Sequence, residues 1–180
     1  MSQARPTRER HRVTWPTLGW VFGRVHRALA FGFGSGLLRP GSGTWGSVAA
    51  LALWWPLSGL LPWAWMGAAL LLASLAGIWI CGRTTDELGV DDHVGVVWDE
   101  IVAVWLVLWA MPNLAWAWVL GFVLFRVFDI VKPWPIRLLD ERVGGGLGVM
   151  LDDWVAAAYA IAGVWACAWG YVALFNDGGW

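Results

Sequence analysis

Three long runs without a charged side chain limit what this chain of 180 residues can fold into. A helix that crosses the apolar core of a bilayer needs about 20 largely apolar residues. The first run has room for two such helices, the second for two shorter helices, and the third for one. We therefore expect an all-α, polytopic membrane helix bundle with about five helices at membrane depth. The three runs are residues 40–82 (with a turn at 56–63), 101–125 (broken at 111–113) and 154–176.

The composition agrees with a membrane location. Charged residues make up 14% of the chain, whereas a soluble domain carries about 25%. The 18 tryptophans suit the aromatic belts found at membrane surfaces, and the 23 glycines suit closely packed membrane helices. The net charge of −1 gives no attraction for a polyanion, so we expect no nucleic-acid partner.

The positive charges predict how the bundle lies across the membrane. All twelve Lys and Arg residues fall in three segments, which are residues 1–39, Arg83 and residues 126–142. Five crossings place these segments on one side, and segments rich in Lys and Arg remain in the cytoplasm. We therefore expect the N-terminus and any active site on the cytoplasmic side, with Trp180 on the opposite side.

The N-terminal region is expected to contain two different parts. Residues 1–14 are expected to form a disordered basic extension, and residues 15–180 a single membrane-embedded domain. Within residues 15–31, apolar residues recur at helical spacing and three basic residues lie between them. This pattern indicates an amphipathic helix in the headgroup layer. The alternative is a cytoplasmic helix packed on the bundle.

Carboxylates gather where the expected helices meet the cytoplasmic surface. Asp99 and Glu100 open the third helix, Asp129 lies near the end of the fourth, and Asp152 and Asp153 lie at the start of the fifth. Like charges repel unless a cation lies among them, and hard oxygen ligands with few histidines favour Mg²⁺ over zinc or copper. Ionisable groups in membrane segments are costly and commonly functional. The pattern indicates a Mg²⁺ site of the kind that handles phosphate groups.

Several of these acids also have a simpler interpretation. Asp152 suits an N-terminal helix cap. Asp129 suits an ion pair with Lys132, because Arg126 and Lys132 lie three residues to either side of it on a helix. These readings give the acids a structural role in place of a chemical one.

Two further hypotheses concern acids elsewhere and a different function. Loop 84–98 carries acids such as Asp86 and Glu87, which are expected to be solvated.

A small cation-binding channel or transporter would also use intramembrane carboxylates. That function predicts acids spread through the depth of the bilayer, whereas the acids here gather at one edge.

Two glycine-rich stretches flank the expected helices. In residues 32–50, glycines permit a close approach of the backbone to an anion, and Thr44 and Ser47 supply hydroxyl groups at a helix start whose dipole favours phosphate. Ordinary loops share this composition. The second stretch, residues 144–148, is expected to be a loop that leads into the helix of Asp152 and Asp153.

Four sequence blocks stand out by their order and spacing. They read "GFGSG…GTWGSVAA", "DDH…VVWDE", "FRVFDIVKPWPIR" and "GGGLGVMLDDWVA". Together they resemble the bacterial phosphatidylglycerophosphatase A family over about residues 31–158. The resemblance implies a Mg²⁺-dependent lipid phosphatase of the bacterial inner (cytoplasmic) membrane. The implied reaction removes the terminal phosphate of the phospholipid phosphatidylglycerophosphate and leaves phosphatidylglycerol.

The resemblance also assigns expected roles to individual residues. The expected Mg²⁺ ligands are Glu100, Asp129, Asp153 and Asp99, with Asp152 as a further ligand or an orienting group. The expected phosphate-binding residues are Arg126, Lys132, Thr44 and Ser47. His93 matches a family position and either protonates the leaving oxygen or has a structural role in its loop.

Overall fold

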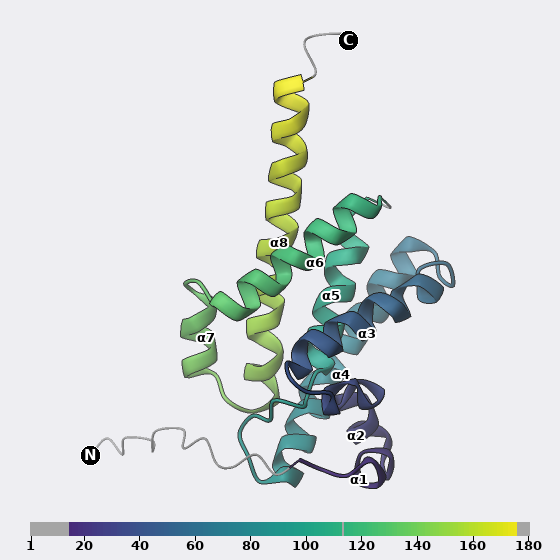
Figure 1. Cartoon of the computed structure of the whole chain (residues 1–180), viewed down its shortest axis with the longest axis vertical. Coiled ribbons are helices and arrows are strands. Elements are labelled where there is room, and N and C mark those ends of the chain that lie inside the picture. Colours follow the sequence, from purple (N-terminus) through teal and green to yellow (C-terminus); the bar gives the residue numbers. More distant parts are fainter. Residues whose placement is uncertain (1–14, 113, 176–180) are drawn as a thin grey trace, which may run out of the picture.

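The computed structural model describes residues 15–112 and 114–175, so the expectations for the extension 1–14 and for Trp180 fall outside it. The regular elements among these residues are all helices, which confirms the all-α class (Figure 1). In chain order they are α1 (Leu18–Phe22), α2 (Val25–Ala30), the 3-10 helix η1 (Gly32–Leu37), α3 (Ser42–Leu57), α4 (Trp63–Leu88), α5 (Trp98–Ala110), α6 (Ala115–Val131), α7 (Ile136–Arg142) and α8 (Gly145–Phe175).

Helix α5 forms the centre of the bundle. It packs against α3, α4, α6 and α8, and nine of its 13 residues are buried. It begins at Trp98 and ends before Met111, so it is about 20 Å long at 1.5 Å per residue. The acids Asp99 and Glu100 therefore lie in the first turn of the most enclosed helix.

Two helices are long and apolar enough to cross a membrane, namely α4 and Gly145–Tyr171 of α8. Helices α3, α5 and α6 have 16, 13 and 17 residues, which is short of a core about 30 Å thick. Five helices at membrane depth were expected, and two helices among the described residues are long enough to span the membrane fully. The charge-free runs also contain the connections between helices, and this leaves fewer residues for each helix than the runs suggest.

Helix α8 begins earlier than expected, because the glycine-rich stretch is helical and is not a loop. Gly146 lies against the backbone of Ile78 and Gly82 in α4, and a Cβ atom at Gly146 would collide with the Ile78 carbonyl. The glycines thus permit α4 and α8 to cross closely. Asp152 lies seven residues after the first residue of α8, so its interpretation as a helix cap is wrong. The upper part of α8 extends beyond the other helices (Figure 1).

The N-terminal region forms two short helices where one amphipathic helix was expected. The chain is extended at Arg24, which separates α1 from α2. Helix α2 packs on α4, and the side chains of Arg24, His26 and Arg27 contact Glu87 at the end of α4. This packing agrees with the alternative of a helix docked on the bundle. The prediction that Glu87 is a solvated surface residue is wrong.

Candidate active site

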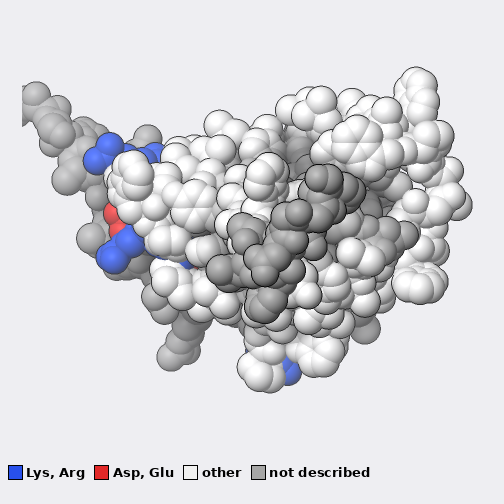
Figure 2. All heavy atoms as spheres, turned by 90° about the horizontal axis from the view of Figure 1, so that it is seen from above, with Lys and Arg blue, Asp and Glu red and all other residues white. Residues whose placement is uncertain are grey.

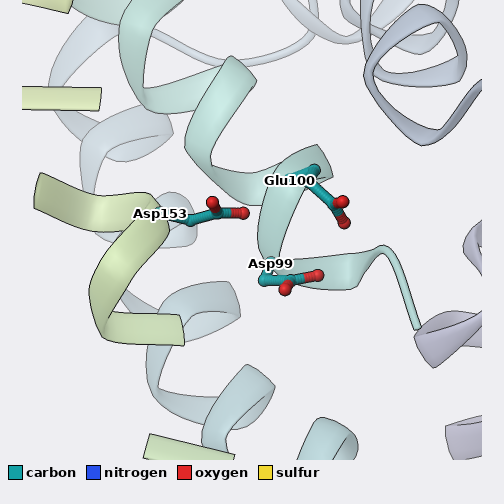
Figure 3. Close-up of side chains that lie close together, drawn as sticks. All are labelled: Asp99, Glu100 and Asp153. Atoms are coloured by element: carbon teal, nitrogen blue, oxygen red, sulfur yellow. The ribbon is translucent and has the colours of Figure 1, made fainter. Parts of the chain in front are cut away.

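Three carboxylates from two helices form the centre of the site. Asp99 and Glu100 come from the first turn of α5, and Asp153 comes from α8 and extends toward them (Figure 3). One oxygen from each of the three groups lies within 4.8 Å of the other two. The contact of α5 with α8 brings together acids that are more than 50 positions apart in the sequence. The predicted convergence of these three acids is therefore found.

The carboxylates of this cluster, and that of the neighbouring Asp152, are buried without enough partners. Asp99, Asp152 and Asp153 are 9%, 7% and 2% exposed. Each of them, and Glu100, has one buried oxygen that accepts no hydrogen bond from any described residue. Buried unpaired charge is costly unless it is neutralised or coordinates a metal. The donor set is all oxygen, which fits a hard cation such as Mg²⁺.

Two cations lie at the edge of this acidic cluster, but they pair differently from the expectation. Arg126 Nη1 lies 2.8 Å from Asp129 Oδ2. Lys132 Nζ lies 2.6 Å from Asp152 Oδ2 and 3.1 Å from Asp140 Oδ1. Helix α6 ends at Val131 and Lys132 has a left-handed backbone, with φ of 46°. Lys132 is therefore not on the helical face of Asp129, and the predicted Asp129–Lys132 ion pair is wrong.

Lys132 remains a charged group in this position. Burial alone acts to lower the pKa of its ammonium group. The hydrogen bond and negative charge of Asp152, together with the charge of Asp140, outweigh burial and raise the pKa above its ordinary value. Lys132 is thus a cation over the whole physiological pH range.

Asp129 lies beside the group of three and not inside it. Its carboxylate pairs with Arg126, and its side chain also contacts Asp153. As a metal ligand, Asp129 would have to share its oxygens between the ion and Arg126. Its assignment as a ligand stays a prediction.

Thr44 and Ser47 contact Arg126. Arg126 Nη2 donates to Thr44 Oγ1 at 3.4 Å, and Arg126 Nη1 donates to Ser47 Oγ at 3.3 Å. Ser47 is fully buried and its hydroxyl also donates to the Gly43 carbonyl. Neither hydroxyl residue is part of the wall of the central cavity. The geometry gives them the task of holding the Arg126 guanidinium group.

Gly43 permits the first turn of α3 to approach the acidic cluster. A Cβ atom at this position would collide with Oε1 of Glu100 and would lie 3.4 Å from Arg126 Nη1. Any larger residue would therefore move the Glu100 carboxylate. The glycine-rich stretch contributes to the site by this close approach of its backbone.

His93 is 1% exposed and faces the same cavity. The Gly95 backbone N–H donates to His93 Nδ1 at 3.0 Å, which assigns the hydrogen of the neutral ring to Nε2. The ring packs against Phe31 and against the edge of Trp15, with centroids 5.6 and 5.5 Å apart. The structure thus fixes the orientation of His93.

A single cavity of about 850 Å³ joins these groups. Its wall includes the three clustered acids together with Asp129, Asp152, Arg126, Lys132 and His93. It also includes three residues that sequence reasoning missed, which are Trp15, Arg39 and Asp140. Asp140 lies on the short helix α7, and no motif or spacing marks it. Trp15 and Arg39 lie outside the acidic blocks, so the sequence gives no sign that they reach the cavity.

The comparison with known protein families decides the class of this site. The family model described as Phosphatidylglycerophosphatase A matches residues 28–168. The chain belongs to the phosphatidylglycerophosphatase A family. It is therefore an enzyme of the phosphatase class, and the resemblance inferred from the sequence blocks is confirmed. No solved structure matches the chain.

Relatives from two bacteria carry the name of this family, and a relative from a third bacterium carries a different phosphatase name. The Haemophilus influenzae protein of that name is 49% identical over 139 residues, covering 77% of this chain and 85% of the relative. The Escherichia coli protein of that name is 46% identical over 129 residues, covering 71% of this chain and 74% of the relative. A Bacteroides thetaiotaomicron protein, 41% identical over 148 residues and covering 78% of this chain and 92% of the relative, carries a provisional name as a phosphatidylinositol-3-phosphatase.

Proposed function

We propose that this protein hydrolyses the terminal phosphate of phosphatidylglycerophosphate and releases phosphatidylglycerol and inorganic phosphate. The observation that carries the proposal is the acidic cluster of Asp99, Glu100 and Asp153, whose buried oxygens lack partners, inside one cavity with Arg126 and Lys132. Membership of the family supports the choice of substrate, because two of its relatives carry the name of this activity. Cations at the rim and acids at the centre suit a phosphate monoester bound next to a metal ion.

We propose Mg²⁺ as the cofactor, held by Glu100, Asp153 and Asp99, with Asp129 as a further ligand and Asp152 as a ligand or orienting group. The fit rests on the all-oxygen donor set and on its unpartnered buried oxygens. When bound in such a site, Mg²⁺ polarises phosphoryl oxygens and lowers the pKa of water. The remaining tasks belong to side chains of this chain.

The two cations would bind the transferring phosphate. Arg126 is fixed by Thr44, Ser47 and Asp129, which orient its guanidinium group before the substrate arrives. Lys132 carries a permanent positive charge at the other side of the acidic cluster. Preoriented cations stabilise negative charge that develops on the phosphoryl oxygens during transfer.

His93 is proposed to serve the leaving group. Hydrolysis breaks the bond between phosphorus and the glycerol oxygen, and that oxygen must take up a proton. The Nε2–H of His93 is a donor in the neutral ring, because Nδ1 accepts from Gly95. A neutral ring cannot release this proton without becoming an imidazolate, so the Nε2–H would donate a hydrogen bond that stabilises the departing oxygen, and water would supply the proton.

The substrate's location supports placing the site at a membrane surface. We propose a multi-pass protein of the bacterial inner membrane with the cavity on the cytoplasmic side. The positively charged segments are separated by the charge-free runs, and segments rich in Lys and Arg remain in the cytoplasm. Seen from above α8, the described surface is uncharged except at its margin (Figure 2). This one-sided arrangement disfavours a channel or transporter, which would carry acids through the bilayer depth.

The test is phosphate release by the full chain purified in neutral detergent. We expect hydrolysis of phosphatidylglycerophosphate with Mg²⁺ present, complete loss with EDTA, and recovery when Mg²⁺ is restored. We also expect kcat/KM for soluble glycerol 3-phosphate to be far lower, because acyl chains supply binding energy that holds the phosphate in line. Activity that survives exhaustive chelation would contradict the metal site, and no hydrolysis of the lipid would contradict the function.

A further inference from the structure

The cavity is larger than a terminal phosphate requires. Its volume of about 850 Å³ falls in the upper part of the range of roughly 300–1,000 Å³ typical of sites that enclose a whole small molecule. The acidic cluster, Arg126 and Lys132 account for one part of its wall. Another part is formed by Trp15 and by residues 39–41, which carry none of the proposed chemistry.

Arg39 is the cation of this second part of the wall. Its guanidinium carbon lies 4.5 Å from the centroid of the Trp15 ring, in a cation–π contact. Arg39 is exposed and makes no ion pair with any described residue. This contrasts with Arg126 and Lys132, which both pair with carboxylates. Arg39 thus lines the cavity with a cation that no described acid neutralises.

The aromatic residues fix the position of Arg39 relative to the catalytic groups. Trp15 contacts both Arg39 and His93. Arg39 also lies four residues before Gly43, whose backbone touches Glu100, so the two α-carbons are at most about 14 Å apart. Arg39 and the acidic cluster therefore line the same cavity from neighbouring parts of the chain.

The proposed substrate carries two phosphates joined by one glycerol unit. The terminal phosphate is the one that is hydrolysed, and the second is the diester that links the headgroup to the diacylglycerol. We propose that Arg39, supported by Trp15, binds the diester phosphate and thereby selects lipids whose headgroup has two phosphates. This inference rests on the proposed function. A planar guanidinium group suits the two non-bridging oxygens of a phosphate diester.

Trp15 makes this subsite a feature of this chain's N-terminal region. It precedes residues 28–168, which the family model covers. Helix α2, which follows it after α1, is attached to α4 through Glu87. The N-terminal region thereby brings an aromatic residue to the cavity wall beside Arg39.

The test compares two soluble inhibitors of phosphatidylglycerophosphate hydrolysis by the full chain. Inorganic phosphate offers one phosphate, whereas glycerol 1,3-bisphosphate offers two across a glycerol. We expect the bisphosphate to inhibit the wild-type protein roughly 10- to 100-fold more strongly, since a charged hydrogen-bond pair corresponds to about that factor. Arg39→Gln should abolish this difference and leave inhibition by inorganic phosphate unchanged.

The same variant should raise KM for the lipid by about 10- to 100-fold, with kcat within a few-fold of wild type. Arg39→Lys should recover part of the loss, and Trp15→Ala should reproduce a smaller part of it. Arg142→Gln is the matched control, because Arg142 is exposed and does not line the cavity. Repeating the assay with and without added phosphatidylglycerol distinguishes the substrate's own phosphate from bulk anionic lipid. If Arg39 instead bound bulk anionic lipid, its effect would disappear in neutral detergent.

Three results would overturn the inference. The first is an unchanged ratio between the two inhibitors in Arg39→Gln, whether or not both bind more weakly. The second is a ratio that changes only because inorganic phosphate binds differently, and the third is an Arg39 effect confined to anionic membranes. If the wild-type protein hydrolyses the lipid but one of these results is obtained, only the proposal of a diester subsite is contradicted. If the wild-type protein does not hydrolyse the lipid, the proposed function is contradicted as well.

Discussion

Two clusters of charged residues in this protein differ in the ratio of acidic to basic side chains. Around Glu87, one carboxylate is surrounded by four basic side chains, which are Arg24, His26, Arg27 and Arg83, at 2.7–3.3 Å. In the acidic cluster, three carboxylates meet within 4.8 Å and none of the three has an ion pair with a described residue. The chain therefore places much of its positive charge away from the acidic cluster.

The difference separates a structural role from a chemical one. Glu87 accepts hydrogen bonds on both oxygens from basic groups, so it holds α2 against α4 and needs nothing more. The acidic cluster retains buried oxygens without partners, which is costly unless a cation from outside is bound. Neutralisation by the chain's own groups marks the first cluster as structural, and its absence marks the second as a candidate binding site.

The largest expected effect comes from removing one charge at the acidic cluster. Asp153→Asn keeps the volume of the side chain but removes a charge from the proposed metal site. Losing a residue that only orients a metal ligand lowers activity by up to about 100-fold. Asp153 is proposed as a ligand itself, so we expect turnover to fall by more than that. Without Mg²⁺ the variant should be at least as stable as wild type, because it relieves repulsion between carboxylates. Turnover and melting temperature measure the two effects. A variant that is unfolded with or without Mg²⁺ would make Asp153 structural, like Glu87.

A smaller effect is expected from moving one acid without changing any charge. Gly43→Ala introduces a methyl group against the Glu100 carboxylate, so we expect kcat to fall by about 10- to 100-fold through misplacement of the site. Gly59→Ala is the matched control, since a Cβ atom there meets nothing within 4 Å. Equal activities of the two variants would show that the position of Glu100 is unimportant.

The smallest effect on activity is expected at Glu87. Glu87→Gln removes the charge that holds three arginines, and charged hydrogen bonds contribute about 1.5–3 kcal/mol. We expect the melting temperature to fall by roughly 3–10 °C, with kcat within a few-fold of wild type. Glu141→Gln breaks an exposed pair with Arg137 and should change the melting temperature by less than about 2 °C. If Glu87→Gln instead abolished turnover at unchanged stability, the contrast between the clusters would be wrong.

Much of the fold was predictable because it follows from local chemistry. Charge-free runs predicted α3 to α6 and α8, and the breaks at 56–63 and 111–113 agree with the observed helix ends. The start of α8 was not predictable, since glycines favour loops unless a neighbouring helix lies as close as α4 does to Gly146. The two-helix form of residues 18–30 depends on the extended backbone of Arg24 and on its contacts with α4.

The site was predictable in its acids and less so in its cations. Asp99 and Glu100 lie at the start of α5 and Asp153 about two turns into α8. The topology brings these two segments to one edge, so the meeting of the acids followed from the helix order. The partners of Lys132 depend on a left-handed residue that ends α6, and no spacing rule shows it. Arg39 and Trp15 reach the cavity through tertiary packing between distant segments.

The most direct test of the central claim is a Mg²⁺ titration of the melting temperature, in neutral detergent and without substrate. At 100 times its dissociation constant, an ion that binds only the folded protein adds about 2.7 kcal/mol of stability, which raises the melting temperature by several degrees. We expect this rise in the wild-type protein and in Glu87→Gln, and its loss in Asp153→Asn. An equal rise in Asp153→Asn, or no rise in the wild-type protein at any Mg²⁺ concentration, would contradict the account.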